Sequence, residues 1–259
     1  MKRFQIGAQS LLSPALPILF GMAIVVILTL ATPGIADERA EDGPSKASAG
    51  GGALRGSVTL GPRLMARKMR FSLYPDLSGV APPAAQPAAE IRNVVIYLSS
   101  PALDALRSTE PSRTFRMEQR NESFVPHVLP VMKGSTVEFP NGDPIYHNVF
   151  SLSRVASFDL GRYPRGASRS IRFDEPGVVK VFCHIHSDMS GVVLVLDNPF
   201  FTAPGPEGSF DFPDLPPGEY TVTAWHERAR PVRRQVVIQA GRTSSVDFAI
   251  PLEDVPVSD

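Results

Sequence analysis

The only cysteine of the 259-residue chain, Cys183, opens the run Cys183-His184-Ile185-His186-Ser187-Asp188-Met189. Apolar, β-prone segments stand on both sides of this run, at 178–182 and at 192–196. Segments of this kind bounded by polar residues are typical of buried strands. The run is therefore predicted to be a short loop between two strands, in which the side chains of Cys183, His186 and Met189 converge.

A second motif, Tyr146-His147-Asn148-Val149, lies 36 positions before the cysteine. One thiolate, two imidazoles and one thioether form the ligand set of a mononuclear blue-copper site. A lone cysteine also has no partner for a disulfide within its own chain. We therefore predict one copper ion bound by His147, Cys183, His186 and Met189.

The sequence leaves other interpretations of these residues open. His184 directly follows Cys183, and adjacent side chains of an extended chain point to opposite faces, so His186 is preferred as the ligand. Zinc also binds Cys and His, although a thioether is an unusual zinc ligand. A buried, inert thiol at Cys183 and a core-filling Met189 are the structural alternatives.

The N-terminus has the pattern of an export signal. Basic residues Lys2 and Arg3 precede an apolar run over 15–31, and small residues stand at Gly34 and Ala36. This order is typical of a cleaved secretory signal, here expected to span 1–36, and it predicts a periplasmic protein with no stable membrane insertion after cleavage. An uncleaved membrane anchor is the alternative, but Pro17 interrupts the apolar run.

The composition predicts an all-β protein, because 26 prolines and 20 glycines separate short alternating segments and few stretches have a helical period. Residues 37–52 are polar and small, which predicts a disordered linker. A copper domain is expected over 53–197, and four short strands over 198–251 predict a second, small β unit. About 50 residues bury little apolar surface on their own. This unit is therefore expected either to pack against the copper domain or to be completed by early strands around 54–74.

Lysines and arginines balance the acidic residues, and no basic excess is concentrated in one segment as nucleic-acid binding would require. One local exception is a stretch predicted to be rich in turns, which holds Arg162, Arg165, Arg169 and Arg172. These arginines form either a solvated face or a surface that steers an acidic redox partner. His127 is expected to be a surface or structural residue, and His226 is expected to lie at a strand end in the C-terminal unit.

Tyr146-His147-Asn148-Val149 together with Cys183-x-x-His186-x-x-Met189 resembles the cupredoxins, in particular the plastocyanin, pseudoazurin and amicyanin group. The resemblance covers roughly 90–197 and implies a Greek-key β-sandwich in which these four side chains bind copper. It also implies that Asn148 ties the two ligand loops together. The loop is similar in length to that of amicyanin, with Ile185 where amicyanin has a proline.

The whole layout also resembles proteins labelled methylamine utilization proteins, which carry a carboxypeptidase regulatory-like, or transthyretin-like, C-terminal unit. The segments 124–129 and 214–226 carry that similarity. The label refers to a gene neighbourhood, so no activity is taken from it.

These observations predict a one-electron carrier that exchanges electrons with an unidentified redox partner protein through the loop around His186. A protein that stores or delivers copper without redox turnover is a second hypothesis, and a cell-envelope interaction module is a third. An enzyme is not expected, because copper oxidases and nitrite reductases need further histidine clusters and the chain has five histidines.

Overall fold

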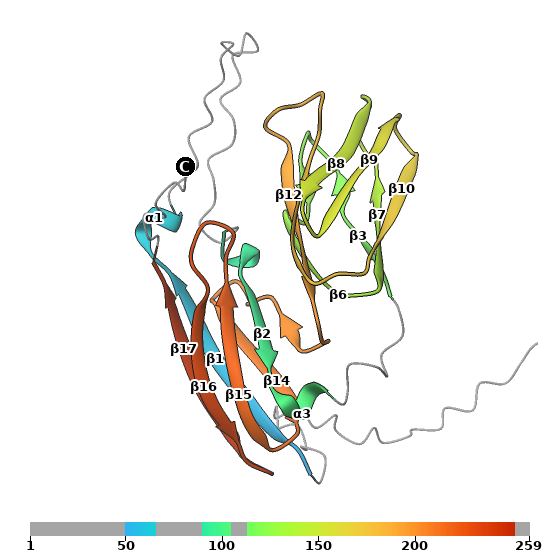
Figure 1. Cartoon of the computed structure of the whole chain (residues 1–259). Coiled ribbons are helices and arrows are strands. Elements are labelled where there is room, and N and C mark those ends of the chain that lie inside the picture. Colours follow the sequence, from blue (N-terminus) through green and yellow to red (C-terminus); the bar gives the residue numbers. More distant parts are fainter. Residues whose placement is uncertain (1–49, 66–89, 105–112, 252–259) are drawn as a thin grey trace, which may run out of the picture. The chain divides into compact units, whose positions relative to one another are not determined.

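The computed structural model describes residues 50–65, 90–104 and 113–251. The predicted signal at 1–36, nearly all of the predicted linker, and the expected strand at 69–74 lie outside these ranges. Within them the protein is almost entirely β-structure, which confirms the predicted fold class (Figure 1). The exceptions are one-turn elements: α1 (Pro62–Met65), η1 (Ile91–Asn93) and α3 (Pro101–Asp104).

Two sheets enclose the first hydrophobic core. One has the order β14-β1-β17 and the other β13-β2-β15-β16. Side chains from both, such as Leu54, Ile96 and Val222, are fully buried in a single cluster. The strands are β1 (Gly52–Leu60), β2 (Val95–Ser99), β13 (Phe201–Thr202), β14 (Ser209–Leu215), β15 (Gly218–Trp225), β16 (Val232–Ile238) and β17 (Thr243–Ile250).

The pairing of β1 and β2 differs from the expected division of the chain at residue 198. β1 lies between β14 and β17, and β2 lies between β13 and β15 (Figure 1). β1 lies within the early segment that was one of the two alternatives, and it pairs with two strands of the C-terminal unit, whereas β2 does so from outside that segment. Without β1, β14 and β17 would have no strand between them, and without β2 the other sheet would lose the strand that joins β13 to β15.

One glycine permits this insertion of β1. A Cβ atom at Gly56 would lie 1.9 Å from the carbonyl oxygen of Val246 and 2.5 Å from Cζ of Phe210. Only a residue without a side chain lets the neighbouring strand and the aromatic ring approach this closely.

A second β-sandwich is built from 114–196 and has its own core. Its five-stranded sheet has the order β6-β12-β11-β8-β9, and a three-stranded sheet has the order β10-β7-β3. Some neighbouring strands, such as β6 and β12, are far apart in the sequence. Val149, Val181 and Phe139 from the two sheets share one buried cluster. The strands are β3 (Thr114–Arg116), β4 (Glu118–Gln119), β5 (Phe124–Val125), β6 (Val128–Met132), β7 (Ser135–Pro140), β8 (His147–Ser153), β9 (Ala156–Tyr163), β10 (Ser168–Phe173), β11 (Gly177–Phe182) and β12 (Ser190–Leu196).

The arginine-containing stretch that was expected to be rich in turns instead forms the strands β9 and β10. Tyr163 and Phe173 point into the core, whereas Arg162, Arg165 and Arg169 are exposed. The alternation of aromatic and charged residues is therefore that of strands with one solvated face.

Candidate metal centre

The predicted ligands lie at the ends of neighbouring strands. His147 is the first residue of β8, Cys183 directly follows β11, and His186 and Met189 belong to the connection from β11 to β12. β8 and β11 are hydrogen-bonded neighbours, paired through Phe150 and Phe182. Two segments 36 residues apart are thus joined by the sheet itself.

Three ligand atoms form a tight group. Sγ of Cys183 lies 3.8 Å from Nδ1 of His147 and 3.7 Å from Nδ1 of His186. The two imidazole rings stand 4.7 Å apart between their centroids, at 64° to each other. Among the described residues, this is the one group of histidine, cysteine and acidic side chains whose ligand atoms all lie within 4.8 Å.

These separations fit a single ion between the three atoms. Metal bonds of about 2.0–2.3 Å to imidazole and thiolate, opened to roughly 120°, place nitrogen and sulfur about 3.8 Å apart. His147 is fully buried and Cys183 is 4% exposed, whereas His186 is half-buried. The centre therefore reaches solvent on the side of His186.

The ligand loop is closed by its own backbone. The N–H of Cys183 donates to the carbonyl of Met189 at 3.2 Å, and the N–H of Met189 donates to the carbonyl of His186 at 3.0 Å. Met189 is 1% exposed and belongs to the same buried cluster as Cys183. Its place in the core holds the loop, and its role as fourth ligand stays a prediction.

His184 is held away from the cysteine. Its ring stacks on Phe150, with centroids 3.7 Å apart and planes 3° from parallel. Its Nε2 lies 3.6 Å from a carboxylate oxygen of Asp159, and both side chains are about half exposed. This orientation agrees with the expectation that adjacent side chains of an extended segment point to opposite faces.

Asn148 joins the two ligand segments, as the family resemblance implies. Its Oδ1 accepts a hydrogen bond from the backbone N–H of His184 at 2.7 Å, and its Nδ2 donates to Asp159 at 3.1 Å. The Asn148 side chain is 1% exposed. Its hydrogen bonds therefore couple the start of β8 to the start of the ligand loop in a place that water reaches poorly.

Asp143 is a residue of the centre that the sequence analysis missed. Its Oδ2 lies 2.8 Å from Nε2 of His147, and the residue is 5% exposed. Burial alone would raise the pKa of Asp143, but hydrogen bonds from Glu122, His147 and Asn121 lower it below its ordinary value. The available signal was an acidic residue in the Asn141-Gly142-Asp143-Pro144 turn, four positions before the histidine.

Neither remaining histidine joins the group. His127 pairs with Glu227 at 2.9 Å, and this partner, opposed by burial, raises the pKa of His127. His226 is buried and pairs with Glu90 at 3.0 Å, next to Arg228. Both histidines thus pair with carboxylates, and His226 directly follows β15, at a strand end as expected.

No protein-family model and no curated protein sequence matches this chain. Solved structures similar to it include a copper-containing nitrite reductase from Thermus scotoductus SA-01, with 28% identity over 34% of this chain and 23% of that one, at a TM-score of 0.32. Amicyanin from Paracoccus versutus has 22% identity over 35% of this chain and 88% of its own, at 0.31. A purple cupredoxin from Nitrosopumilus maritimus has 24% identity over 33% of this chain and 100% of its own, at 0.30.

These three solved structures are a copper-containing nitrite reductase, an amicyanin and a purple cupredoxin, and each match covers about a third of this chain. The chain spans only about a quarter of the nitrite reductase. Overlaps with TM-scores near 0.3 do not carry a function from those proteins to this one.

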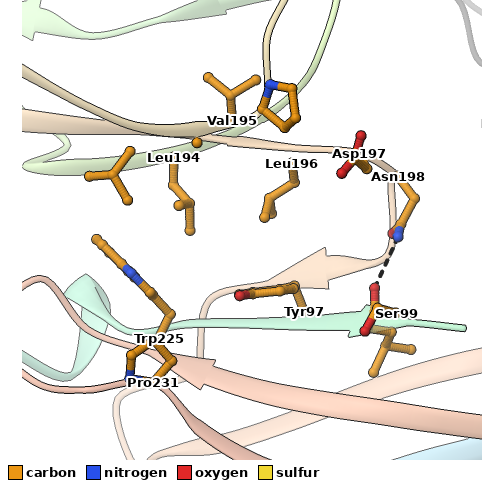
Figure 2. A pocket seen from close by; sticks show the side chains of 13 residues that line it. Tyr97, Ser99, Leu194, Val195, Leu196, Asp197, Asn198, Trp225 and Pro231 are labelled. Carbon is orange, nitrogen blue, oxygen red and sulfur yellow. Dashed lines mark hydrogen bonds between the residues drawn. The ribbon is translucent and has the colours of Figure 1, made fainter. Parts of the chain in front are cut away.

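A pocket elsewhere in the molecule does not contribute to this centre. Figure 2 shows it lined by Tyr97, Trp225, Leu194 and Leu196 among others, and none of the four predicted ligands borders it. Asn198 closes one end by donating to the carbonyl of Leu98 at 2.9 Å. Within the described ranges, no helix has the length and apolar character needed to cross a membrane.

Proposed function

We propose that this protein is a periplasmic type 1 copper protein of the cupredoxin family that carries one electron at a time. The observation that carries this proposal is the group formed by Cys183, His147 and His186, whose ligand atoms all lie within 4.8 Å of one another. One thiolate and two imidazoles in this arrangement are the three strong ligands of a blue-copper site, and Met189 supplies the weak fourth.

The donor set favours copper over zinc. Thiolate and thioether suit the reduced ion, and imidazole suits both oxidation states. Structural zinc sites instead use four nitrogen, oxygen or thiolate ligands, and a thioether is not among them. A copper ion bound here would accept one electron from a donor and pass it to an acceptor.

The chain's own residues keep the ligand atoms in place between those two events. The backbone hydrogen bonds between Cys183 and Met189 close the loop, and Asn148 fixes it to β8. A centre that is held by strands and moves little has a small reorganisation cost for electron transfer.

His186 provides the route to the surface. It is half-buried, while His147 is fully buried and Cys183 nearly so. Exposed apolar side chains of Ile145, Tyr146 and Ile185 flank the two histidine motifs, with Tyr146 59% exposed. A redox partner protein is expected to dock over His186, where the path from the metal to the surface is shortest.

Export to the periplasm rests on the pattern at 1–36, and the absence of an enzymatic role rests on the small number of histidines. Both are part of the proposal. The C-terminal unit, completed by β1 and β2, is assigned no part in electron transfer.

The test is an absorption spectrum of the copper-loaded full-length protein together with its reduction potential. A strong visible thiolate-to-copper band and a reversible one-electron potential are expected. Cys183→Ser removes the thiolate and should abolish the band, whereas His184→Ala, a matched change on the same loop, should retain it. Tight binding of reduced copper without a band in the wild type would contradict electron transfer and favour storage or delivery.

A further inference from the structure

A buried carboxylate faces the far side of the His147 ring. The imidazole of His147 is fully buried, with Nδ1 3.8 Å from Sγ of Cys183 and Nε2 2.8 Å from Oδ2 of Asp143. A neutral imidazole carries one N–H. The nitrogen that donates this proton to the carboxylate therefore has no free lone pair to offer to a metal. The position of Asp143 therefore determines which nitrogen is available to a metal.

Asp143 is itself held by the turn between β4 and β5. The backbone N–H of Asn121 donates to Oδ1 at 2.6 Å and that of Glu122 donates to Oδ2 at 2.9 Å. Both donors have φ of 53°, a left-handed conformation that disfavours residues with a Cβ. The two strained residues aim consecutive N–H groups at one carboxylate, a concave anion-binding arrangement.

The loop that carries Asp143 is fixed at its base as well. Oδ1 of Asn141 accepts from the N–H of Asp143 at 2.9 Å. Nδ2 of Asn141 donates to the carbonyls of Ile145 at 2.8 Å and Tyr163 at 3.2 Å. Asn141 is 2% exposed, so these bonds form in a buried site. Asp143 is thus held both at its carboxylate, by Asn121 and Glu122, and at its backbone, by Asn141.

We propose that Asp143 is a positioning residue, which keeps the proton of His147 on Nε2 and directs the Nδ1 lone pair at Cys183. The contacts of the ring with Asp143 and Cys183 fix its orientation. The consequence for a bound ion rests on the function proposed above: a histidine that donates to a carboxylate is a stronger ligand, which stabilises oxidised copper more than reduced copper.

The first experiment needs no metal. Nitrogen-15 NMR of the metal-free protein at pH 7.5 reports the protonated nitrogen of His147. The wild type and the control Asp188→Asn, an exposed acidic residue of the ligand loop, should show protonation at Nε2. Asp143→Ala should shift the ratio of Nε2–H to Nδ1–H at least about tenfold, the usual scale for losing a charge-assisted hydrogen bond. A wild-type ring protonated at Nδ1, or an unchanged ratio in folded Asp143→Ala, would overturn the proposal.

Asp143→Asn covers the case in which Asp143→Ala does not fold. Its amide oxygen can still accept from Nε2 of His147, so the tautomer should be retained while the negative charge is lost. In the copper-loaded protein, affinity for oxidised copper should fall about tenfold more than affinity for reduced copper, within the 10–100-fold range typical of such partners. Tenfold corresponds to a rise of about 59 mV in potential. Equal losses for the two oxidation states would contradict a role in tuning the ligand.

The two proposals fail differently. A wild type without a thiolate-to-copper band contradicts the proposed function, whatever the state of His147. A blue wild-type protein whose tautomer and potential do not respond to changes at Asp143 contradicts only the positioning role.

Discussion

Replacement of Asn148 by Ala tests whether the ligand loop is held by the side chain that links it to β8. The change removes a 2.7 Å hydrogen bond from the N–H of His184 and a 3.1 Å hydrogen bond to Asp159. A buried hydrogen bond contributes about 0.5–1.5 kcal/mol net, and the donor left without a partner adds to the loss. Because Asp159 is about half exposed, its share is small. We expect the metal-free protein to lose about 2 kcal/mol of unfolding free energy.

Asn198→Ala is the matched control. Asn198 is also buried, donates to the carbonyl of Leu98 at 2.9 Å and accepts from the N–H of Phe200 at 3.0 Å, but these hydrogen bonds do not involve the ligand loop. Urea unfolding measures the global loss in each variant, and amide hydrogen exchange reports the opening of 183–189.

Both variants should lose similar stability, and only Asn148→Ala should accelerate exchange of the loop, by roughly 30-fold for about 2 kcal/mol. Equal loop protection in the two variants, or a loss below about 0.5 kcal/mol in Asn148→Ala, would refute the idea that Asn148 holds the loop.

Three further predictions concern other parts of the molecule. Burial opposes ionisation of Glu90, but His226 and Arg228 lower its pKa from 4.5 to about 2. The free energy of unfolding should therefore fall by at most about 3 kcal/mol as the pH drops from 4.5 to 2. Unfolding of Glu90→Gln, followed over the same pH range, should lack this fall, and a profile equal to that of the wild type would contradict the prediction. Gly56→Ala should lower the free energy of unfolding by about 3 kcal/mol, measured by heat or urea, because the new Cβ would overlap Val246 and Phe210. Gly50→Ala, with open space around it, should leave the stability unchanged. Equal effects of the two changes would count against the clash. Replacing Arg162, Arg165 and Arg169 together by Gln should slow the oxidation of the copper-loaded protein by hexacyanoferrate(III), and the rate should then depend less on ionic strength. The control replaces Arg233 and Arg234 on β16 by Gln. Equal slowing in both variants would exclude local steering.

Much of the candidate site could be predicted from the sequence because its ligands occupy local motifs. Cys183, His186 and Met189 lie within one loop, and the preference for His186 over His184 followed from the alternation of side chains along an extended segment. The role of Asn148 came from the family resemblance, and the structure places its amide between the two ligand segments. Strands such as β11 and β12 were evident from their apolar runs.

Asp143 was not predictable in the same way. Its importance depends on Asn121 and Glu122, whose N–H groups come from a turn about 20 residues earlier in the chain. A sequence pattern shows that Asp143 lies in a turn, but it does not show which backbone donors meet its carboxylate or which ring faces it. Those contacts exist only after β4, β5 and β8 have packed.

The sequence by itself determined the all-β class, the positions of most strands and the identity of the side chains that can bind a metal, because strand alternation and ligand chemistry are local properties. Only the tertiary structure decided that β1 and β2 complete the C-terminal sheets and that Asp143 holds His147. An alternating segment reveals that one of its faces is buried but not which distant strand covers it. That choice is made by the total apolar area and hydrogen bonding of the whole folded chain.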